Sequence, residues 1–75
     1  MSDRPTQRDY VLCLSNRGYK ASLVVRKLYE AVPDEEGARR GLLRVVDESG
    51  EDYLFRQVLF AAVELPAEVR EQLAS

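Results

Sequence analysis

Residues 42–55, LLRVVDESGEDYLF, decide the fold of this 75-residue chain. The acidic and small residues in their middle are typical of a β-hairpin turn, in which the Asp47 carboxylate accepts a hydrogen bond from the backbone two residues later. Gly50 can adopt the left-handed conformation that closes a G1 bulge. The apolar and aromatic runs on either side, 42–46 and 52–55, favour strands. The sequence therefore predicts a β-hairpin to which further strands are added.

A first strand and a long loop are predicted upstream of the hairpin. Residues 10–14 alternate so that Val11 and Cys13 share one face, and the pattern leaves open which face is the core. Residues 15–22 contain Ser, Asn and Gly and form a loop.

The second strand region is predicted at 23–25 and 27–32, with a kink near Arg26. Pro33 ends it, because proline cannot donate a hydrogen bond to a strand ladder. Residues 34–41 begin with acids, end with bases and close on glycine, which is typical of a short helical turn, although a loop is the alternative.

The spacing of apolar residues changes toward the end of the chain. Residues 57–60 predict a 3₁₀ turn, and 61–64 predict a last short strand. A helix is expected after Pro66, with Val69 and Leu73 four residues apart on the face that docks.

These elements define a mainly β fold in one small domain. The predicted organisation is a disordered N-terminus (1–8), a barrel (9–65) and a C-terminal helical appendage (66–75). Five short antiparallel strands indicate a small SH3-like five-stranded barrel, since closing the sheet removes edges that so short a chain cannot cover otherwise.

Three motifs carry a resemblance to a known group of proteins. They are Cys-x-x-Asn at 13–16, Lys-x-Tyr-Glu at 27–30 and Asp-x-Ser-Gly-Glu-Asp-Tyr at 47–53. In this order they resemble small uncharacterised bacterial and phage SH3-like barrel proteins, over residues 10–63. The resemblance implies the fold and no activity. The chain departs from the pattern at Arg26, where glycine is usual, and at Arg56, where proline is common.

The charged residues nearly balance, because 11 Lys and Arg against 13 Asp and Glu give a formal net charge of −2. Nucleic-acid-binding proteins normally show a strong basic excess, so the balance disfavours nucleic acid as the main partner. The chain has no histidine, the commonest general base and metal ligand. Cys13 is a lone cysteine, best explained as a small core residue. We therefore expect a non-enzymatic protein without catalytic, cofactor or metal sites.

The location is also predicted from composition. No apolar run approaches the roughly 18 residues that would indicate a membrane span, and residues 1–9 lack the apolar core of a signal peptide. We expect a cytoplasmic protein that makes no membrane contact and is a monomer or a weak homodimer.

Five side chains are the candidates for a binding site: Arg17, Tyr19, Lys20, Tyr53 and Phe55. Peptide-binding barrels of this class hold proline-rich segments in aromatic grooves. Those grooves usually include a tryptophan, and this chain has none. Phe55 is by default a core residue, since a core this small needs its aromatic residues inside. The predicted function is protein–protein interaction.

The alternative is a weak nucleic-acid-binding surface. Arg17, Lys20, Arg26 and Lys27 are basic, and Tyr19 among them can stack on a base. A solvated loop whose cations offset the acids of the hairpin turn is the competing interpretation.

Four carboxylates lie within residues 47–52, which raises the possibility of a calcium loop. Calcium loops of the EF-hand kind need a longer spacing and flanking helices, whereas the flanks here are strand-like. A solvated turn is therefore predicted.

Overall fold

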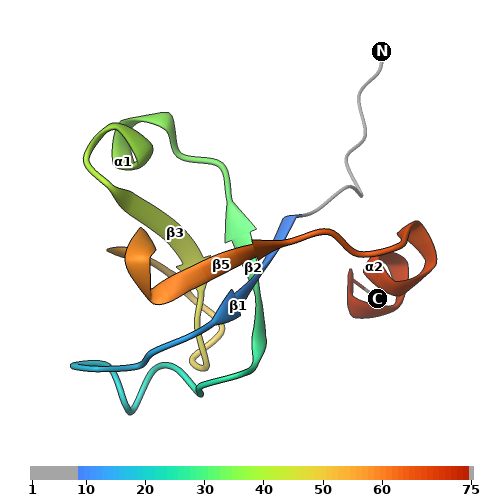
Figure 1. Ribbon diagram of the computed structural model, residues 1–75, viewed down its shortest axis with the longest axis horizontal. Coiled ribbons are helices and arrows are strands. Elements are labelled where there is room, and N and C mark those ends of the chain that lie inside the picture. Colours follow the sequence, from blue (N-terminus) through green and yellow to red (C-terminus); the bar gives the residue numbers. More distant parts are fainter. Residues whose placement is uncertain (1–8, 75) are drawn as a thin grey trace.

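Five antiparallel strands form a single sheet, in the order β4-β3-β2-β1-β5, in the computed structural model, which describes residues 9–74 (Figure 1). The predicted mainly β fold with a short C-terminal helix is confirmed. The elements in chain order are β1 (Asp9–Cys13), β2 (Leu28–Val32), α1 (Glu35–Arg39), β3 (Leu42–Val46), β4 (Asp52–Arg56), the 3₁₀ helix η1 (Gln57–Leu59), β5 (Phe60–Val63) and α2 (Ala67–Ala74).

The β3–β4 turn has the predicted geometry. Gly50 has a φ of +86°, and its N–H donates to the Asp47 carbonyl at 2.9 Å. The Asp47 N–H donates to the Glu51 carbonyl at 3.0 Å, and the Asp47 carboxylate accepts from the Ser49 N–H at 2.8 Å. The turn is therefore the type I turn with a G1 bulge that the sequence predicted.

The sheet is strongly curled but not closed. β4 and β5 lie at opposite edges of the sheet, yet only the three residues of η1 join them. A 3₁₀ turn rises about 2 Å per residue, so β4 ends and β5 begins within roughly 10 Å of each other. The rings of Phe55 and Phe60 meet across this seam with centroids 6.1 Å apart. The two strands form no ladder with each other, so the expected barrel closure is absent from the described part of the chain.

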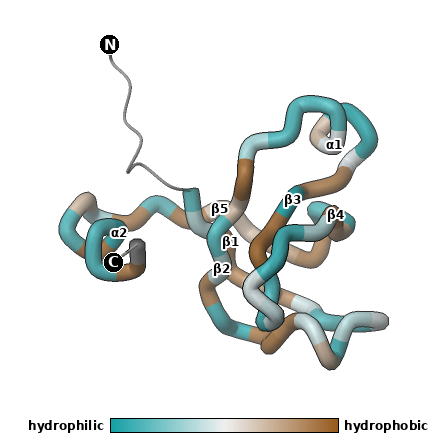
Figure 2. Tube along the Cα trace, turned by 180° about the vertical axis from the view of Figure 1, so that it is seen from behind, coloured by the Kyte–Doolittle hydropathy of each residue, from teal (hydrophilic) through white to brown (hydrophobic). Residues whose placement is uncertain are grey.

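The core lies inside this curl, and β1 shows which of its faces is the inner one. Val11 and Cys13 point into the core, where Cys13 is completely buried. The other buried members of the cluster are Leu23, Tyr29, Val45, Phe55, Leu59 and Phe60. In the tube coloured by hydropathy, hydrophobic segments lie on the strands and α1 is largely hydrophilic (Figure 2).

The expected strand at 23–25 is wrong, because these residues belong to the loop between β1 and β2. Leu23 is nevertheless 1 % exposed, and its carbonyl accepts a hydrogen bond from the Asn16 side chain at 3.1 Å. A buried apolar residue held by a loop hydrogen bond satisfies the same hydropathy pattern as a strand residue. The pattern alone could not distinguish them.

The predicted kink is a bulge at Arg26, whose φ is +72°. The Arg26 N–H donates to the Cys13 carbonyl at 2.7 Å, and the Cys13 N–H donates to the Lys27 carbonyl at 2.9 Å. Arg26 and Lys27 thus lie opposite the single residue Cys13, in the pattern of a G1 bulge. Glycine normally fills this position because a side chain is strained there.

The two helices lie far apart, α1 beside the start of β3 and α2 beyond the end of β5 (Figure 1). Asp34 caps the N-terminus of α1, since its carboxylate accepts from the Gly37 N–H at 2.8 Å. Gly37 is buried against Leu54, and a side chain at Gly37 would come within 2.9 Å of it.

α2 confirms the predicted C-terminal helix but packs loosely. Val69 and Leu73, the residues expected to dock, remain 38 % and 45 % exposed. Leu73 reaches a pocket shared with Tyr10 and Leu28. The predicted N-terminus, 1–8, and residue 75 of the predicted appendage lie outside the described residues.

Two of the left-handed positions, Arg26 and Gly50, give a paired prediction. Arg26→Gly should raise the free energy of unfolding by about 1 kcal/mol, because it removes the strain of a side chain at positive φ. Gly50→Ala should lower it by about 1 kcal/mol for the opposite reason. A Cβ at Gly50 would have no atom within 4 Å, so the loss would report backbone strain.

Thermal and urea unfolding measure both changes, with Arg26→Lys as the control that keeps the backbone strain. A stabilisation of the same size in Arg26→Lys would contradict the backbone explanation.

Candidate binding groove

A groove runs between the β1–β2 loop and the β3–β4 hairpin, with a volume of about 380 Å³. It is lined by Tyr19, Ser22, Asp47, Ser49, Tyr53, Leu54 and Phe55. Three of the five predicted binding residues thus meet in one place: Tyr19 on the loop, and Tyr53 and Phe55 on β4. Arg17 and Lys20 are exposed in the same loop but do not line the groove.

The aromatic side chains have different roles in this groove. Phe55 is 3 % exposed and belongs to the core. Tyr19 packs edge-on against Phe55, with ring centroids 5.0 Å apart and an interplanar angle of 83°, yet it stays 38 % exposed. Tyr53 is 48 % exposed, and its hydroxyl donates to the Glu51 carboxylate at 2.8 Å. That contact raises the pKa of Tyr53 above its ordinary value.

The free edge of β4 borders the groove, because three consecutive β4 residues line it. Two hydrogen bonds fix which β4 backbone groups face β3: the Asp47 N–H to the Glu51 carbonyl at 3.0 Å, and the Gln57 N–H to the Gly41 carbonyl at 2.9 Å. The bonding direction alternates along an antiparallel strand, so Tyr53 and Phe55 turn their backbone groups toward β3 while Leu54 turns its groups away. β4 is an edge strand, so no strand pairs with the Leu54 N–H and carbonyl.

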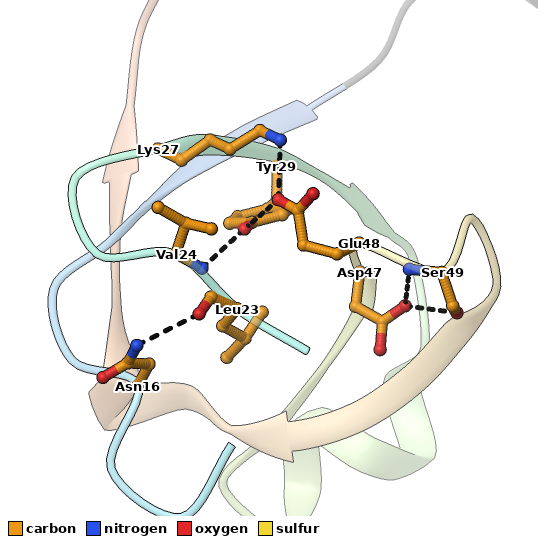
Figure 3. Close-up of polar contacts among 8 residues, drawn as sticks. All are labelled: Asn16, Leu23, Val24, Lys27, Tyr29, Asp47, Glu48 and Ser49. Carbon is orange, nitrogen blue, oxygen red and sulfur yellow. Dashed lines mark hydrogen bonds and ion pairs between the residues drawn. The ribbon is translucent and has the colours of Figure 1, made fainter. Parts of the chain in front are cut away.

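The loop is held against the hairpin by a buried hydroxyl (Figure 3). Tyr29 on β2 is 5 % exposed. Its hydroxyl accepts from the Val24 N–H at 2.7 Å and donates to the Glu48 carboxylate at 2.5 Å. The same carboxylate oxygen accepts from the Lys27 ammonium at 2.6 Å. The Glu48 N–H in turn donates to the Ser22 carbonyl at 3.0 Å. These contacts set the distance between the two walls of the groove.

This network shifts the pKa values of its members. Hydrogen bonds from Lys27 and then from Tyr29 lower the pKa of Glu48. Burial, followed by the Glu48 contact, raises the pKa of Tyr29 to about 12. Glu48 is therefore the charged acceptor of the network at neutral pH, and Tyr29 keeps its proton.

The expectation of a solvated turn is wrong for Asp47, which is only 7 % exposed. Its carboxylate accepts from the Ser49 hydroxyl at 2.5 Å and from the Ser49 N–H at 2.8 Å. These bonds, led by that of the Ser49 hydroxyl, lower the pKa of Asp47. One of the four carboxylates thus organises the turn from inside, where its hydrogen bonds compensate the cost of burial.

The structure separates the basic residues of the proposed nucleic-acid surface. Lys27 is paired with Glu48, and its ammonium lies 5.5 Å from the centroid of the Tyr29 ring. Arg26 occupies the bulge and is exposed. Arg17 and Lys20 make no ion pair with any residue in the described range.

The sequence analysis did not identify several residues that form the walls of the groove or hold those walls together. Ser22, Ser49 and Leu54 line it without having been singled out. The Tyr29–Glu48 contact joins residues 19 positions apart. A tyrosine placed on the inner face of a strand needs a partner for its hydroxyl, and this was the available signal.

Other kinds of site were sought over the same residues. Residues 9–74 contain no group of three or more acidic or cysteine side chains placed to hold a metal ion. No helix in this part of the chain is long and apolar enough to cross a membrane. Comparison with protein-family models, curated proteins and solved structures finds no match for the chain.

The lowered pKa of Glu48 gives a pH prediction. Because folding lowers the pKa of Glu48, the unfolded state binds more protons at pH values between the folded and unfolded pKa values. The charged Glu48 therefore stabilises the fold fully above about pH 4.3, the ordinary glutamate pKa. That contribution is lost as pH falls through the folded pKa. Glu48→Gln should therefore lower the thermal midpoint at pH 7, and its difference from wild type should shrink as the pH falls toward 2.5.

Thermal melts followed by circular dichroism across this pH range test the expectation. Glu64→Gln, an exposed carboxylate outside the network, is the matched control and should follow wild type. A Glu48→Gln difference that stays constant down to pH 2.5 would contradict a role for the charge.

Proposed function

We propose that this protein is a small non-enzymatic binding module that takes an extended segment of a partner protein in the groove between the β1–β2 loop and β4. The observation that carries the proposal is the placement of Tyr19 and Tyr53. They come from segments far apart in the sequence, yet both line one groove while remaining 38 % and 48 % exposed.

Exposed tyrosines beside a free strand edge suit the binding of an extended chain. Tyrosine provides a large contact area at a low cost in conformational entropy and is enriched at interfaces. The Leu54 N–H and carbonyl can bond to a strand added at the sheet edge, which is a common mode of peptide recognition. Backbone pairing would supply affinity, and the aromatic walls would supply specificity.

We interpret the curled sheet as an SH3-like barrel left open between β4 and β5. The strand order and the 3₁₀ connection between the two edges support this interpretation. It agrees with the resemblance to small SH3-like barrel proteins and explains why a groove exists at the edge of β4.

The charges around the groove favour a protein segment over a polyanion. The hairpin wall carries Asp47, Glu51 and Asp52, whereas Arg17 and Lys20 lie near Tyr19 in the opposite loop. Carboxylates repel phosphates, so a nucleic acid would meet repulsion on one wall. A segment with both signs of charge fits better.

Nucleic-acid binding is the second candidate function. It is supported by the exposure of Tyr19 between Arg17 and Lys20, with Arg26 exposed in the same loop. Such binding would weaken steeply with added salt.

The proposal is tested by selecting peptides from a random library against the full-length protein and mapping them by ¹⁵N NMR. Amide shifts should cluster on residues 19–22, 47–49 and 53–55. Tyr19→Ala and Tyr53→Ala should each weaken binding about tenfold, the loss expected for an aromatic anchor. Val58→Ala is the matched control, because Val58 is 74 % exposed and lies outside the groove.

Peptide shifts confined to α2 or η1 would overturn the groove. Salt-sensitive shifts at Arg17, Lys20 and Arg26 with a single-stranded oligonucleotide, together with failure of every selected peptide, would favour the second candidate.

A further inference from the structure

The β4 edge carries a charge pattern that is complementary to itself. β4 has the sequence Asp-Tyr-Leu-Phe-Arg, residues 52–56. Asp52, Leu54 and Arg56 lie on one face of the strand, because side chains alternate along it. The same three residues turn their backbone away from β3, as the hydrogen bonds at both ends of the strand require. An acid, an apolar residue and a base thus follow one another along the open edge.

We propose that β4 pairs antiparallel with β4 of a second copy of this chain, centred on Leu54. Leu54 would face Leu54 of the second copy, and their N–H and carbonyl groups would exchange two hydrogen bonds. Asp52 would face Arg56 of the second copy, and Arg56 would face its Asp52. The two sheets would then be joined through their edges by an interface in which each copy contributes the same surface.

The charge pattern selects this arrangement over the alternatives. A parallel in-register pairing would put Asp52 opposite Asp52 and Arg56 opposite Arg56, which is repulsive. An antiparallel pairing shifted by two residues would put Leu54 opposite a charge. The pairing centred on Leu54 matches both charges and the apolar position.

Asp52 and Arg56 are available for ion pairs with a second copy. Asp52 lies 4.0 Å from Arg44, but Arg44 is already held by Asp34 at 2.8 Å. Arg56 makes no ion pair with another described residue. On the other face of the strand, Tyr53 would lie opposite Phe55 of the second copy, which would cover part of its exposed ring.

The other open edge lacks this pattern. β5 has the sequence Phe-Ala-Ala-Val and carries no charge, so nothing in it selects a register or a direction. The argument therefore applies to β4 alone among the two edge strands of the described sheet.

The inference rests on the proposed function to the extent that both use the free β4 edge. A strand pair of five residues buries less area than stable dimers, which bury more than about 1,200 Å². We therefore expect reversible association, in competition with a partner segment for the same edge.

Sedimentation equilibrium of the full-length protein tests the inference, with concentrations raised to about 1 mM to cover weak interfaces. The mass should rise from one chain to two. Asp52→Arg and Arg56→Asp should each stay at the mass of one chain, because each places like charges opposite one another. A mixture of these two variants should recover the doubled mass, and so should the double variant Asp52→Arg/Arg56→Asp, because both restore opposite charges.

Glu64→Arg is the matched control, since it changes the net charge as much as Asp52→Arg but lies outside β4, and it should dimerise like wild type. Circular dichroism confirms that each variant is folded. A wild-type mass of one chain at every concentration, or dimers that persist in both single variants, would overturn the inference. If wild type stays at the mass of one chain while selected peptides still bind the groove, self-association fails and the proposed function stands.

Discussion

The buried hydroxyl of Tyr29 is the contact on which the groove depends. It accepts from the Val24 N–H and donates to Glu48, so it joins the β1–β2 loop to the β3–β4 turn across a part of the sheet where β2 and β3 no longer pair. The loop contains turns but no helix or strand, so tertiary contacts such as this one fix its position against the hairpin. Leaving the Tyr29 hydroxyl without a partner would carry the desolvation cost of a buried polar group. Tyr19 and Tyr53 therefore line the same groove because Tyr29 holds the loop against the hairpin.

The second constraint is the short connection between the sheet edges. η1 brings the ends of β4 and β5 together, and the Phe55–Phe60 contact seals the core there. Away from η1 the two edges carry no ladder between them. An unpaired strand edge presents N–H and carbonyl groups that can pair with another chain. A partner segment or a second copy would each supply the missing backbone partner, which links the proposed function to the proposed self-association.

Local signals in the sequence predicted most of the fold. Turn chemistry placed Gly50 correctly. Strand periodicity and the Pro66 signal placed all five strands, the second through its 27–32 part, the 3₁₀ turn and the C-terminal helix to within about two residues. Residues 23–25 were predicted wrongly because Leu23 is buried by loop hydrogen bonds rather than by a ladder. For the site, composition suggested Tyr19 and Tyr53. Composition could not predict that Asp47 is buried or that Tyr29 contacts Glu48, since both depend on the folded structure.

Amide hydrogen exchange in Tyr29→Phe tests the central claim most directly, namely that this one hydroxyl holds the loop against the hairpin. Removing it deprives the Val24 N–H of its acceptor and should loosen the Glu48 N–H bond to Ser22. We predict exchange about tenfold faster at Val24 and Glu48, the effect of losing one good hydrogen bond, with the Val11 and Val45 amides of the sheet much less affected. Exchange that is unchanged at Val24 and Glu48, or that rises equally at all four amides, would contradict the account.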